Sequence, residues 1–345
     1  MLPYFIVLVL VIFWVALENA SLKRKSFWFP LLILSIFSGI RNYSVGTDSP
    51  GYTRMFRDNF PISDYTFSEH VEPGYQLLRY FLLSLTHNYF WLFFTTTLII
   101  VGSYLFTIKR LSTNYTLSVF FFITLGAYTF SFNGLRQGIA VAIMALAAPY
   151  LIQKNFRVFL LIALIASAFH STALILLPFY FLLHWKIKLP FKATGIFLTT
   201  LLISSTVISY LAANNPRYEV YTEETKAGGL VVLSFNIFIV IALYLVNYLY
   251  KIRDNNFHLL LQFYSLGVVF VIPFAILGTN PSGPQRMLNY FSWLIVILLP
   301  IALKKVNNII IYLIAIMLSL VYFGLTTSTF SHLTPYTLNP IFEIL

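Results

Sequence analysis

Long apolar runs separated by short polar breaks fill most of the chain. A helix that spans a bilayer needs about 20 apolar residues, and fewer where flanking side chains reach the interface. Twelve predominantly apolar runs approach that length, at residues 2–17, 27–40, 90–108, 115–132, 134–152, 156–169, 171–184, 190–213, 230–250, 257–277, 287–303 and 307–325. The pattern predicts an all-α polytopic integral membrane protein, with about twelve transmembrane helices in a single transmembrane domain over residues 1–345.

A further apolar stretch, residues 74–85, is interrupted by Gln76 and Arg79. These side chains fit poorly against lipid along a full span, so we expect a re-entrant or interfacial helix there. The helix would belong to a long loop at residues 41–89. A short tail at residues 326–345 would lie on the same side of the membrane.

The composition agrees with a membrane protein and excludes several other classes. Of the 345 residues, 59% are hydrophobic and only 10% are charged, with a mean hydropathy of +0.82. So few polar side chains cannot cover a water-soluble globule, and a disordered chain would be far more polar. The absence of cysteine from the sequence also excludes a disulfide-stabilised secreted module.

The basic residues are distributed unevenly between the two sets of alternate loops. One set carries fourteen Lys and Arg against two acidic residues, whereas the opposite set carries eight against nine. Because cytoplasmic loops are enriched in Lys and Arg, the basic set is predicted to be cytoplasmic and both termini to face outward. The net charge of +11 thus reflects topology and requires no nucleic-acid partner.

The outer loops use arginine where topology alone would accept either basic residue. Five arginines stand near predicted helix ends on this face: Arg41, Arg79, Arg136, Arg217 and Arg286. The planar guanidinium group can bind phosphate or carboxylate through two parallel hydrogen bonds. The outer face is therefore the predicted place of chemistry, with Arg217 the weakest of these candidates.

The long loop carries candidate polar groups near both of its ends. A turn rich in Gly, Asp and Pro bears Asp48 and Tyr52, and Glu72 and Tyr75 stand where the chain returns to the membrane. Either carboxylate can be a solvated loop charge or a functional group, and the pattern leaves both interpretations open.

Two predicted helix starts suit the binding of an anion. Asn133, as the expected N-cap, shares one face of a first turn with Arg136 and Gln137. Arg286 enters another apolar run in the same way, followed by Tyr290. For the first segment, a plain cap with an arginine that reaches the head groups is the alternative.

His170 stands between two apolar runs that are each short for a full span. Two half-depth helices meeting there would place an imidazole in or near the membrane on the outer side. Ionisable groups in such positions mark functional sites by default, and His is suited to proton transfer near neutral pH. A neutral His that bonds a helix carbonyl or Ser171 is the other interpretation.

Several motifs are missing from the sequence. It has no Cys/His metal pattern, no phosphate-binding loop, no serine-hydrolase motif and no ATPase domain. We expect neither a metal nor a cofactor, and an energy-coupled pump is disfavoured. The substrate would then have to carry its own activation, delivered on the outer face.

With these motifs, the chain resembles the EpsG-like branch of the Wzy oligosaccharide polymerases from Arg41 to about Leu303. The resemblance is carried by Arg41 with Val45-Gly46-Thr47-Asp48 and Tyr52, by Glu72-Pro73-Gly74-Tyr75, by Asn133, Arg136 and Gln137, by Phe169-His170-Ser171, and by Arg286 with Tyr290-Phe291. Each motif alone is weak, but their order and spacing make the joint match specific.

The resemblance implies a GT-C-like glycosyltransferase of the bacterial inner membrane whose active face is periplasmic. Its donor and acceptor would be oligosaccharide repeat units linked to undecaprenyl diphosphate. Inverting, metal-independent glycosyl transfer would join them into O-antigen, capsule or exopolysaccharide. The implied partners are these lipid-linked substrates and membrane lipid, with a chain-length regulator protein as a further candidate.

The same resemblance gives the candidate residues their roles. Diphosphate and substrate binding would involve Arg41, Arg136, Arg286, Arg217, Asn133, Gln137, Tyr52, Tyr75 and Tyr290. His170 is the first candidate for the base that deprotonates the acceptor hydroxyl, with Asp48 or Glu72 as alternatives.

Three other functions compete with the polymerase interpretation. A lipid-linked oligosaccharide flippase or a polysaccharide channel would place charges along a path through the membrane. A membrane O-acyltransferase would need a histidine that is open to the cytoplasm. An O-antigen ligase would share the diphosphate chemistry but would transfer to a different acceptor.

Overall fold

The computed structural model describes residues 1–214, 229–278, 280 and 283–342. Their regular structure is helical, and one isolated antiparallel bridge joins Arg41 to Leu338. Contacts divide the chain into two compact units. The first comprises Met1–Tyr150, Arg157–Leu174 and Asn307–Leu345, and the second comprises Leu151–Phe156 and Ile175–Val306.

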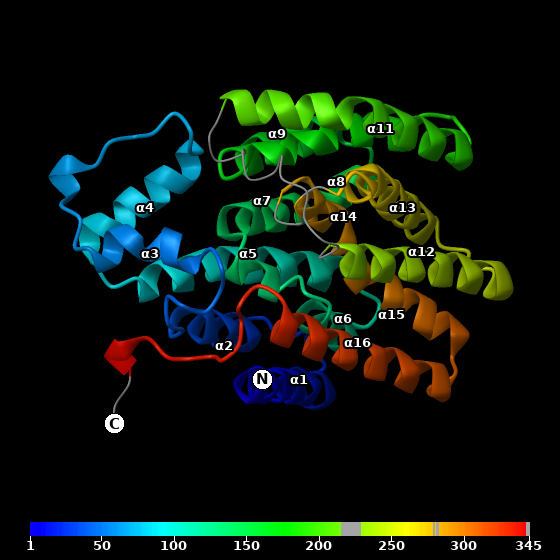
Figure 1. Cartoon of the computed structure of the whole chain (residues 1–345). Coiled ribbons are helices and arrows are strands. Elements are labelled where there is room, and N and C mark those ends of the chain that lie inside the picture. The colour runs from blue at the N-terminus through cyan, green and yellow to red at the C-terminus, as the bar shows by residue number, and fades with distance from the viewer. Residues whose placement is uncertain (215–228, 279, 281–282, 343–345) are drawn as a thin grey trace. The chain divides into compact units, whose positions relative to one another are not determined.

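The first unit contains the two ends of the described chain and the long loop (Figure 1). The elements that lie wholly or mostly in it are α1 (Leu2–Leu22), α2 (Trp28–Gly39), α3 (Ser49–Arg57), η1 (Ile62–Asp64), α4 (Pro73–Leu85), α5 (Phe90–Leu111), α6 (Tyr115–Thr124), η2 (Thr129–Phe132), α7 (Leu135–Ala145), α8 (Ala148–Ile152), α9 (Phe156–Ser167), η3 (Ser171–Ile175), α16 (Ile309–Thr329) and η6 (Pro340–Phe342). Helices α3 and α4 both belong to the long loop.

The second unit is built around α13 (Asn255–Ile276), which packs against α10 (Leu176–His184), α11 (Leu189–Asn214) and α12 (Leu230–Tyr250). The elements η5 (Pro284–Leu288), α14 (Asn289–Ser292) and α15 (Ile295–Val306) also contact α13. The Tyr264 hydroxyl donates to Asn236 Oδ1 at 2.8 Å, which joins α13 to α12 through buried polar groups.

The described residues include six stretches long and apolar enough to cross a membrane: Leu2–Leu22, Phe90–Leu111, Tyr115–Phe132, Leu230–Tyr250, Asn255–Ile276 and Ile309–Thr329. A bent pair, Pro284–Ser292 with Ile295–Val306, would be a seventh. The protein is therefore a polytopic, membrane-embedded helical protein. Each predicted apolar run falls on a helix or a helix pair, but several of these helices are short. The count of about twelve spans, the GT-C-like architecture and the single domain stay predictions.

Burial differs sharply between helices that are mostly apolar. Helix α7 is buried on nearly every side, as expected for a core helix. In contrast, only 17% of the residues in the most apolar stretch of α1 and 11% of those in α16 are buried within the protein. Their exposed faces consist of large apolar side chains, which suits contact with lipid.

Side-chain caps mark the starts of three long apolar segments. The side chains of Asn114, Asp254 and Asn308 accept hydrogen bonds from backbone N–H groups in the first turns of α6, α13 and α16. These groups have no partner within the helix, so each cap fixes where its helix begins.

Helix α4 forms where the sequence predicts a re-entrant or interfacial helix. It has one buried face, with Gln76 and Leu83, and one exposed apolar face, with Leu77, Phe81 and Leu85. At 13 residues it is too short for a regular span. Its depth in the membrane stays a prediction.

Candidate functional site

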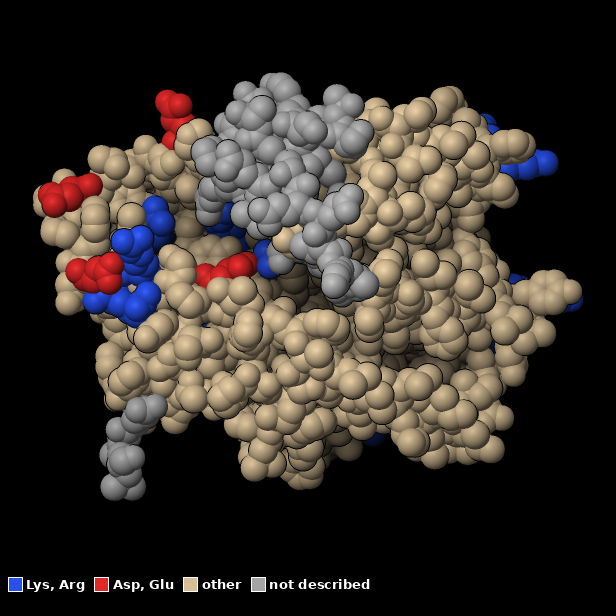
Figure 2. Space-filling view, in the orientation of Figure 1, with Lys and Arg blue, Asp and Glu red and all other residues tan. Residues whose placement is uncertain are grey.

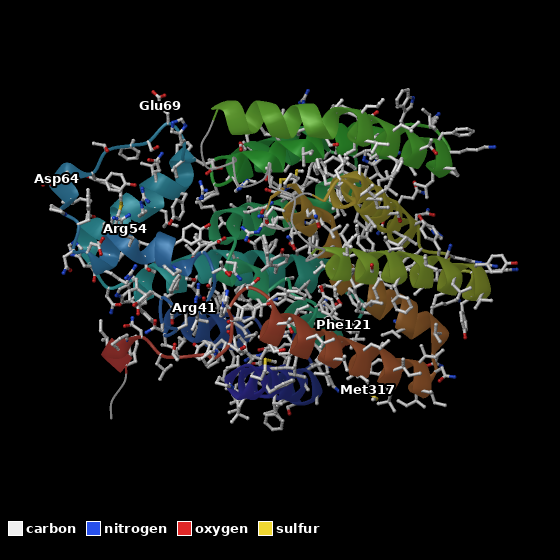
Figure 3. All side chains as sticks on the ribbon, viewed as in Figure 1. Arg41, Arg54, Asp64, Glu69, Phe121 and Met317 are labelled. Atoms are coloured by element: carbon white, nitrogen blue, oxygen red, sulfur yellow. The ribbon has the colours of Figure 1, made fainter. Side chains whose placement is uncertain are left out.

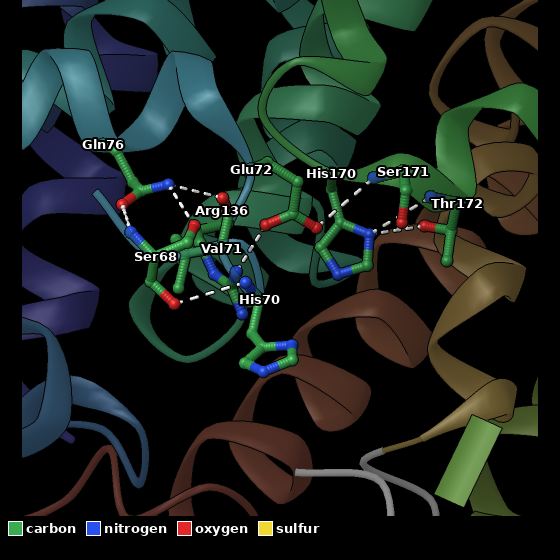
Figure 4. A network of polar contacts seen from close by, with 9 residues as sticks. All are labelled: Ser68, His70, Val71, Glu72, Gln76, Arg136, His170, Ser171 and Thr172. Atoms are coloured by element: carbon green, nitrogen blue, oxygen red, sulfur yellow. Dashed lines mark hydrogen bonds and ion pairs between the residues drawn. The ribbon is translucent and has the colours of Figure 1, made fainter. Parts of the chain in front are cut away.

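Three separate segments of the first unit meet at one junction (Figure 4). They are the end of the long loop at Glu72, the first turn of α7 at Arg136, and the turn after α9 at His170. We call this group of residues the Arg136 junction. On the face shown in Figure 2, charged side chains gather over the end of the unit that carries α3 and α4.

An ion pair forms the centre of the Arg136 junction. Arg136 Nη1 donates to Glu72 Oε2, and the two side chains are only 14% and 13% exposed. The other carboxylate oxygen, Glu72 Oε1, accepts from the backbone N–H of Ser171 at 3.4 Å. One carboxylate thus connects the start of α7 to the turn that contains His170.

A backbone contact holds the same two segments together. The N–H of Gly74, in the first turn of α4, donates to the carbonyl of Ala168 at 2.7 Å. A Cβ atom at Gly74 would lie 2.7 Å from that carbonyl oxygen, so a side chain there would force the segments apart. Glycine is therefore required for this close approach.

A buried amide fixes the shape of the loop before Glu72. Gln76 is 3% exposed, and its Oε1 accepts from the Ser68 N–H at 2.7 Å. Its Nε2 donates to the carbonyls of Ser68 and Val71, at 2.8 and 2.6 Å. These bonds fold residues 68–72 into a tight arch whose last residue is Glu72.

Aromatic side chains line the guanidinium of Arg136. Its Cζ lies 5.9 Å from the ring centroid of Tyr75, and Tyr52 is a further hydrogen-bond partner of Arg136. The rings of Tyr52 and Tyr75 meet edge to face with centroids 5.8 Å apart. The Tyr75 hydroxyl is buried and has no hydrogen-bond partner among the described residues.

The residues around the start of α7 differ in one respect from the expected arrangement. The N-cap of α7 is Gly134 rather than Asn133. The Asn133 side chain instead accepts from the backbone N–H of Asp48 at 3.4 Å, which ties the turn before α3 to α7. Asn133 and Gln137 are both buried, whereas Asp48 is partly exposed.

His170 lies at the break between α9 and η3, where the sequence predicts that two short helices meet. Its Nδ1 lies 2.7 Å from Thr172 Oγ1 and also accepts from the Thr172 backbone N–H at 3.4 Å. Because a backbone N–H can only donate, Nδ1 carries the lone pair in this geometry. The proton of the neutral ring is then on Nε2.

Arg41 lies in a different environment from Arg136. It is 1% exposed, and its Cζ lies 3.5 Å from the ring centroid of Phe93 and 4.2 Å from that of Phe132. Its Nη1 donates to the carbonyl and the hydroxyl of Ser38. A guanidinium enclosed in this way contributes to packing, and the predicted contact of Arg41 with diphosphate is untested.

The remaining candidates lie in the second unit or outside the described residues. Arg286 is in η5, where its carbonyl accepts from the Asn289 side chain at 2.8 Å. Tyr290, in α14, is 1% exposed. Arg217 is not among the described residues, so its predicted role is untested.

The sequence analysis did not single out Gln76 or Thr172, which contact the arch before Glu72 and the His170 ring. Gln76 is named there only as an interruption of an apolar run. A lone amide within an apolar helix was the available signal for Gln76.

The periphery of the long loop has a simpler character. Figure 3 places Arg54, Asp64 and Glu69 at the edge of the first unit, whereas Arg41 lies inward beside α2. Arg54 forms an exposed ion pair with Asp58.

Across the described residues, no group of three or more His, Asp or Glu side chains is arranged to hold a metal ion.

Comparison with known families agrees with the membrane architecture. Residues 24–338 match the family model described as the EpsG family. No curated protein and no solved structure is detectably similar to the chain. Because the match covers most of its length, the chain belongs to the EpsG family, which is associated with membrane polysaccharide synthesis and glycosyltransferase-like polymerase activity.

Proposed function

We propose that this EpsG-family protein polymerises oligosaccharide repeat units linked to undecaprenyl diphosphate, at the periplasmic face of the bacterial inner membrane. The observation that carries the proposal is the convergence of Arg136, Glu72 and the His170 turn from three segments of one unit. A donor that is already activated requires only groups that bind the leaving diphosphate and a group that accepts a proton.

In the proposed reaction, a hydroxyl of the acceptor unit attacks the anomeric carbon of the donor sugar. Attack opposite the diphosphate inverts the configuration at that carbon. Arg136 stabilises the negative charge that develops on the departing diphosphate, in a site largely shielded from water. Tyr52, which is partly exposed, offers its ring and hydroxyl group to the sugars beside it, whereas the predicted contact through the buried Tyr75 stays untested.

Other predicted residues keep narrower proposed roles. Arg286, Arg217 and Tyr290 remain proposed substrate contacts. Asn133 and Gln137 would support Arg136 from the same end of α7, where both are buried. Glu72, His170 and Asp48 are the candidates for the base.

Purified full-length protein in nanodiscs, supplied only with lipid-linked repeat unit, provides the test. We expect a glycan ladder on a gel from the wild-type protein and none from Arg136→Gln, with both proteins equally folded. No reaction until a lipid A core is added would identify a ligase instead. Transfer of the substrate across a vesicle membrane without a new glycosidic bond would identify a transporter.

A further inference from the structure

The Glu72 carboxylate occupies a position that suits a phosphate group. It accepts hydrogen bonds from the guanidinium of Arg136 and from the backbone N–H of Ser171. Guanidinium and backbone N–H groups are the donors that proteins commonly direct at phosphate oxygens. The protein therefore fills its own anion-binding position with a carboxylate, and an incoming diphosphate has to compete for Arg136.

Hydrogen bonds fix the backbone on both sides of Glu72. The Gln76 amide holds the preceding arch through hydrogen bonds to Ser68 and Val71, and Gly74 is bonded to Ala168. An incoming anion that replaces the carboxylate at Arg136 can therefore be accommodated by rotation of the Glu72 side chain, without movement of the backbone. A displaced carboxylate would stay at the Arg136 junction.

The geometry of His170 favours a donor role over a base role. Its Nδ1 accepts from Thr172, so the proton of the neutral ring is on Nε2. In this tautomer Nε2 carries the proton, and the lone pair of Nδ1 is engaged by Thr172 rather than directed at an acceptor hydroxyl. Glu72 is then the better-placed group to take the proton of the acceptor hydroxyl.

We propose an exchange of anions on Arg136 that turns Glu72 from the partner of this arginine into the catalytic base, an inference that rests on the proposed function. The donor diphosphate displaces the carboxylate from Arg136. The acceptor oxygen then bonds to the anomeric carbon while its proton passes to Glu72. The bond from that carbon to the diphosphate oxygen breaks, and the diphosphate departs with the electron pair, bound to Arg136.

The substitution Glu72→Gln tests the exchange in purified full-length protein. Binding of inorganic pyrophosphate, measured by calorimetry in detergent without added phospholipid, should tighten about tenfold because the competing charge is gone. Polymerisation should fall below detection because the base is gone. The matched control Glu69→Gln, on the exposed loop three residues earlier, should leave both quantities unchanged.

A second variant keeps the test decisive if Glu72→Gln does not fold. Glu72→Asp retains the charge on a shorter side chain, so it should bind pyrophosphate more tightly than wild type and keep part of the polymerase activity. Weaker or unchanged pyrophosphate binding in the folded variants overturns the exchange, as does no binding to any of the proteins.

Two comparisons distinguish a failure of the exchange from a failure of the proposed function. Tighter pyrophosphate binding by Glu72→Gln, together with a wild-type protein that makes no polymer, would support the exchange and overturn the proposed function. A wild-type protein that makes polymer, together with no tighter pyrophosphate binding by Glu72→Gln, would support the proposed function and overturn the exchange. Undecaprenyl diphosphate should displace pyrophosphate better than phosphatidylglycerol does; the reverse order would assign the position to a phospholipid head group and overturn the exchange.

Discussion

Arg41 and Arg136 lie in the same unit, but their guanidinium groups have different surroundings. Arg41 lies between the rings of Phe93 and Phe132, and no described carboxylate is within ion-pair distance of it. Arg136 is paired with Glu72 and keeps 14% of its side chain exposed. A cation enclosed by rings contributes packing, whereas a cation held by one movable carboxylate can exchange it for another anion.

The C-terminal tail completes the region around Arg41. The backbone N–H of Asn42 donates to the Thr337 carbonyl at 2.8 Å, and the Tyr336 ring stacks on Phe37 with centroids 4.4 Å apart. Burial lowers the pKa of the Arg41 guanidinium to about 10, while nearby phenols, including that of Tyr336, favour the charged form. Arg41 therefore remains a cation at neutral pH.

The largest expected effect comes from removing the charge at Arg136. Arg136→Met should lower the polymerisation rate by about 10²–10³-fold, because a donor to the developing charge is lost. The measurement is the rate of ladder formation divided by the amount of folded protein, and size-exclusion chromatography gives that amount. A rate near that of wild type would show that diphosphate binding does not depend on Arg136.

At Arg41 the volume of the side chain should matter more than its charge. Arg41→Ala should destabilise the protein by about 3 kcal/mol because it leaves a cavity between aromatic rings. Arg41→Met should recover much of this loss, since it refills the space. Apparent Tm in detergent is the readout, with polymerisation per folded protein retained in both variants. Equal loss of activity in Arg41→Met and Arg136→Met would remove the distinction between the two regions.

The close approach at Gly74 should have a smaller effect that is confined to the Arg136 junction. Gly74→Ala should slow polymerisation about tenfold or more, because its Cβ would push the His170 turn away from Glu72. Gly51→Ala is the matched control, since a Cβ at Gly51 would meet no atom within 4 Å. The same rate from both variants would mean that this contact does not position the reacting groups.

The smallest expected effect concerns one hydrogen bond of the tail. The Tyr336 hydroxyl donates to the Phe37 carbonyl. Tyr336→Phe keeps the stacked ring but removes the donor, so stability should fall by about 1 kcal/mol with polymerisation unaffected. A modest decrease in apparent Tm would agree with this, and a loss of activity would link the tail to the reaction.

The sequence predicts where helices form better than it predicts which residues are in contact in the folded chain. The apolar runs predict most of the helices, and the polar positions within residues 74–85 set α4 apart from them. The short runs on either side of His170 predict the break there. These features depend on periodicity and length along the chain. The five arginines look alike in sequence, however, because what surrounds a guanidinium depends on segments far away. Phe93 and the returning tail determine the environment of Arg41, and Glu72 determines that of Arg136.

Local capping also proved less predictable than helix existence. Asn133 is an ordinary N-cap residue in sequence, yet its side chain bonds Asp48, which is 85 positions away. Gln76 and Thr172 likewise act through contacts that only the folded chain creates.

The most direct measurement is a cryo-EM structure of the full-length protein bound to undecaprenyl diphosphate. We expect diphosphate density within hydrogen-bonding distance of the Arg136 guanidinium, with the Glu72 carboxylate released from it. Diphosphate bound away from an intact Arg136–Glu72 pair would rule out the exchange of anions on Arg136.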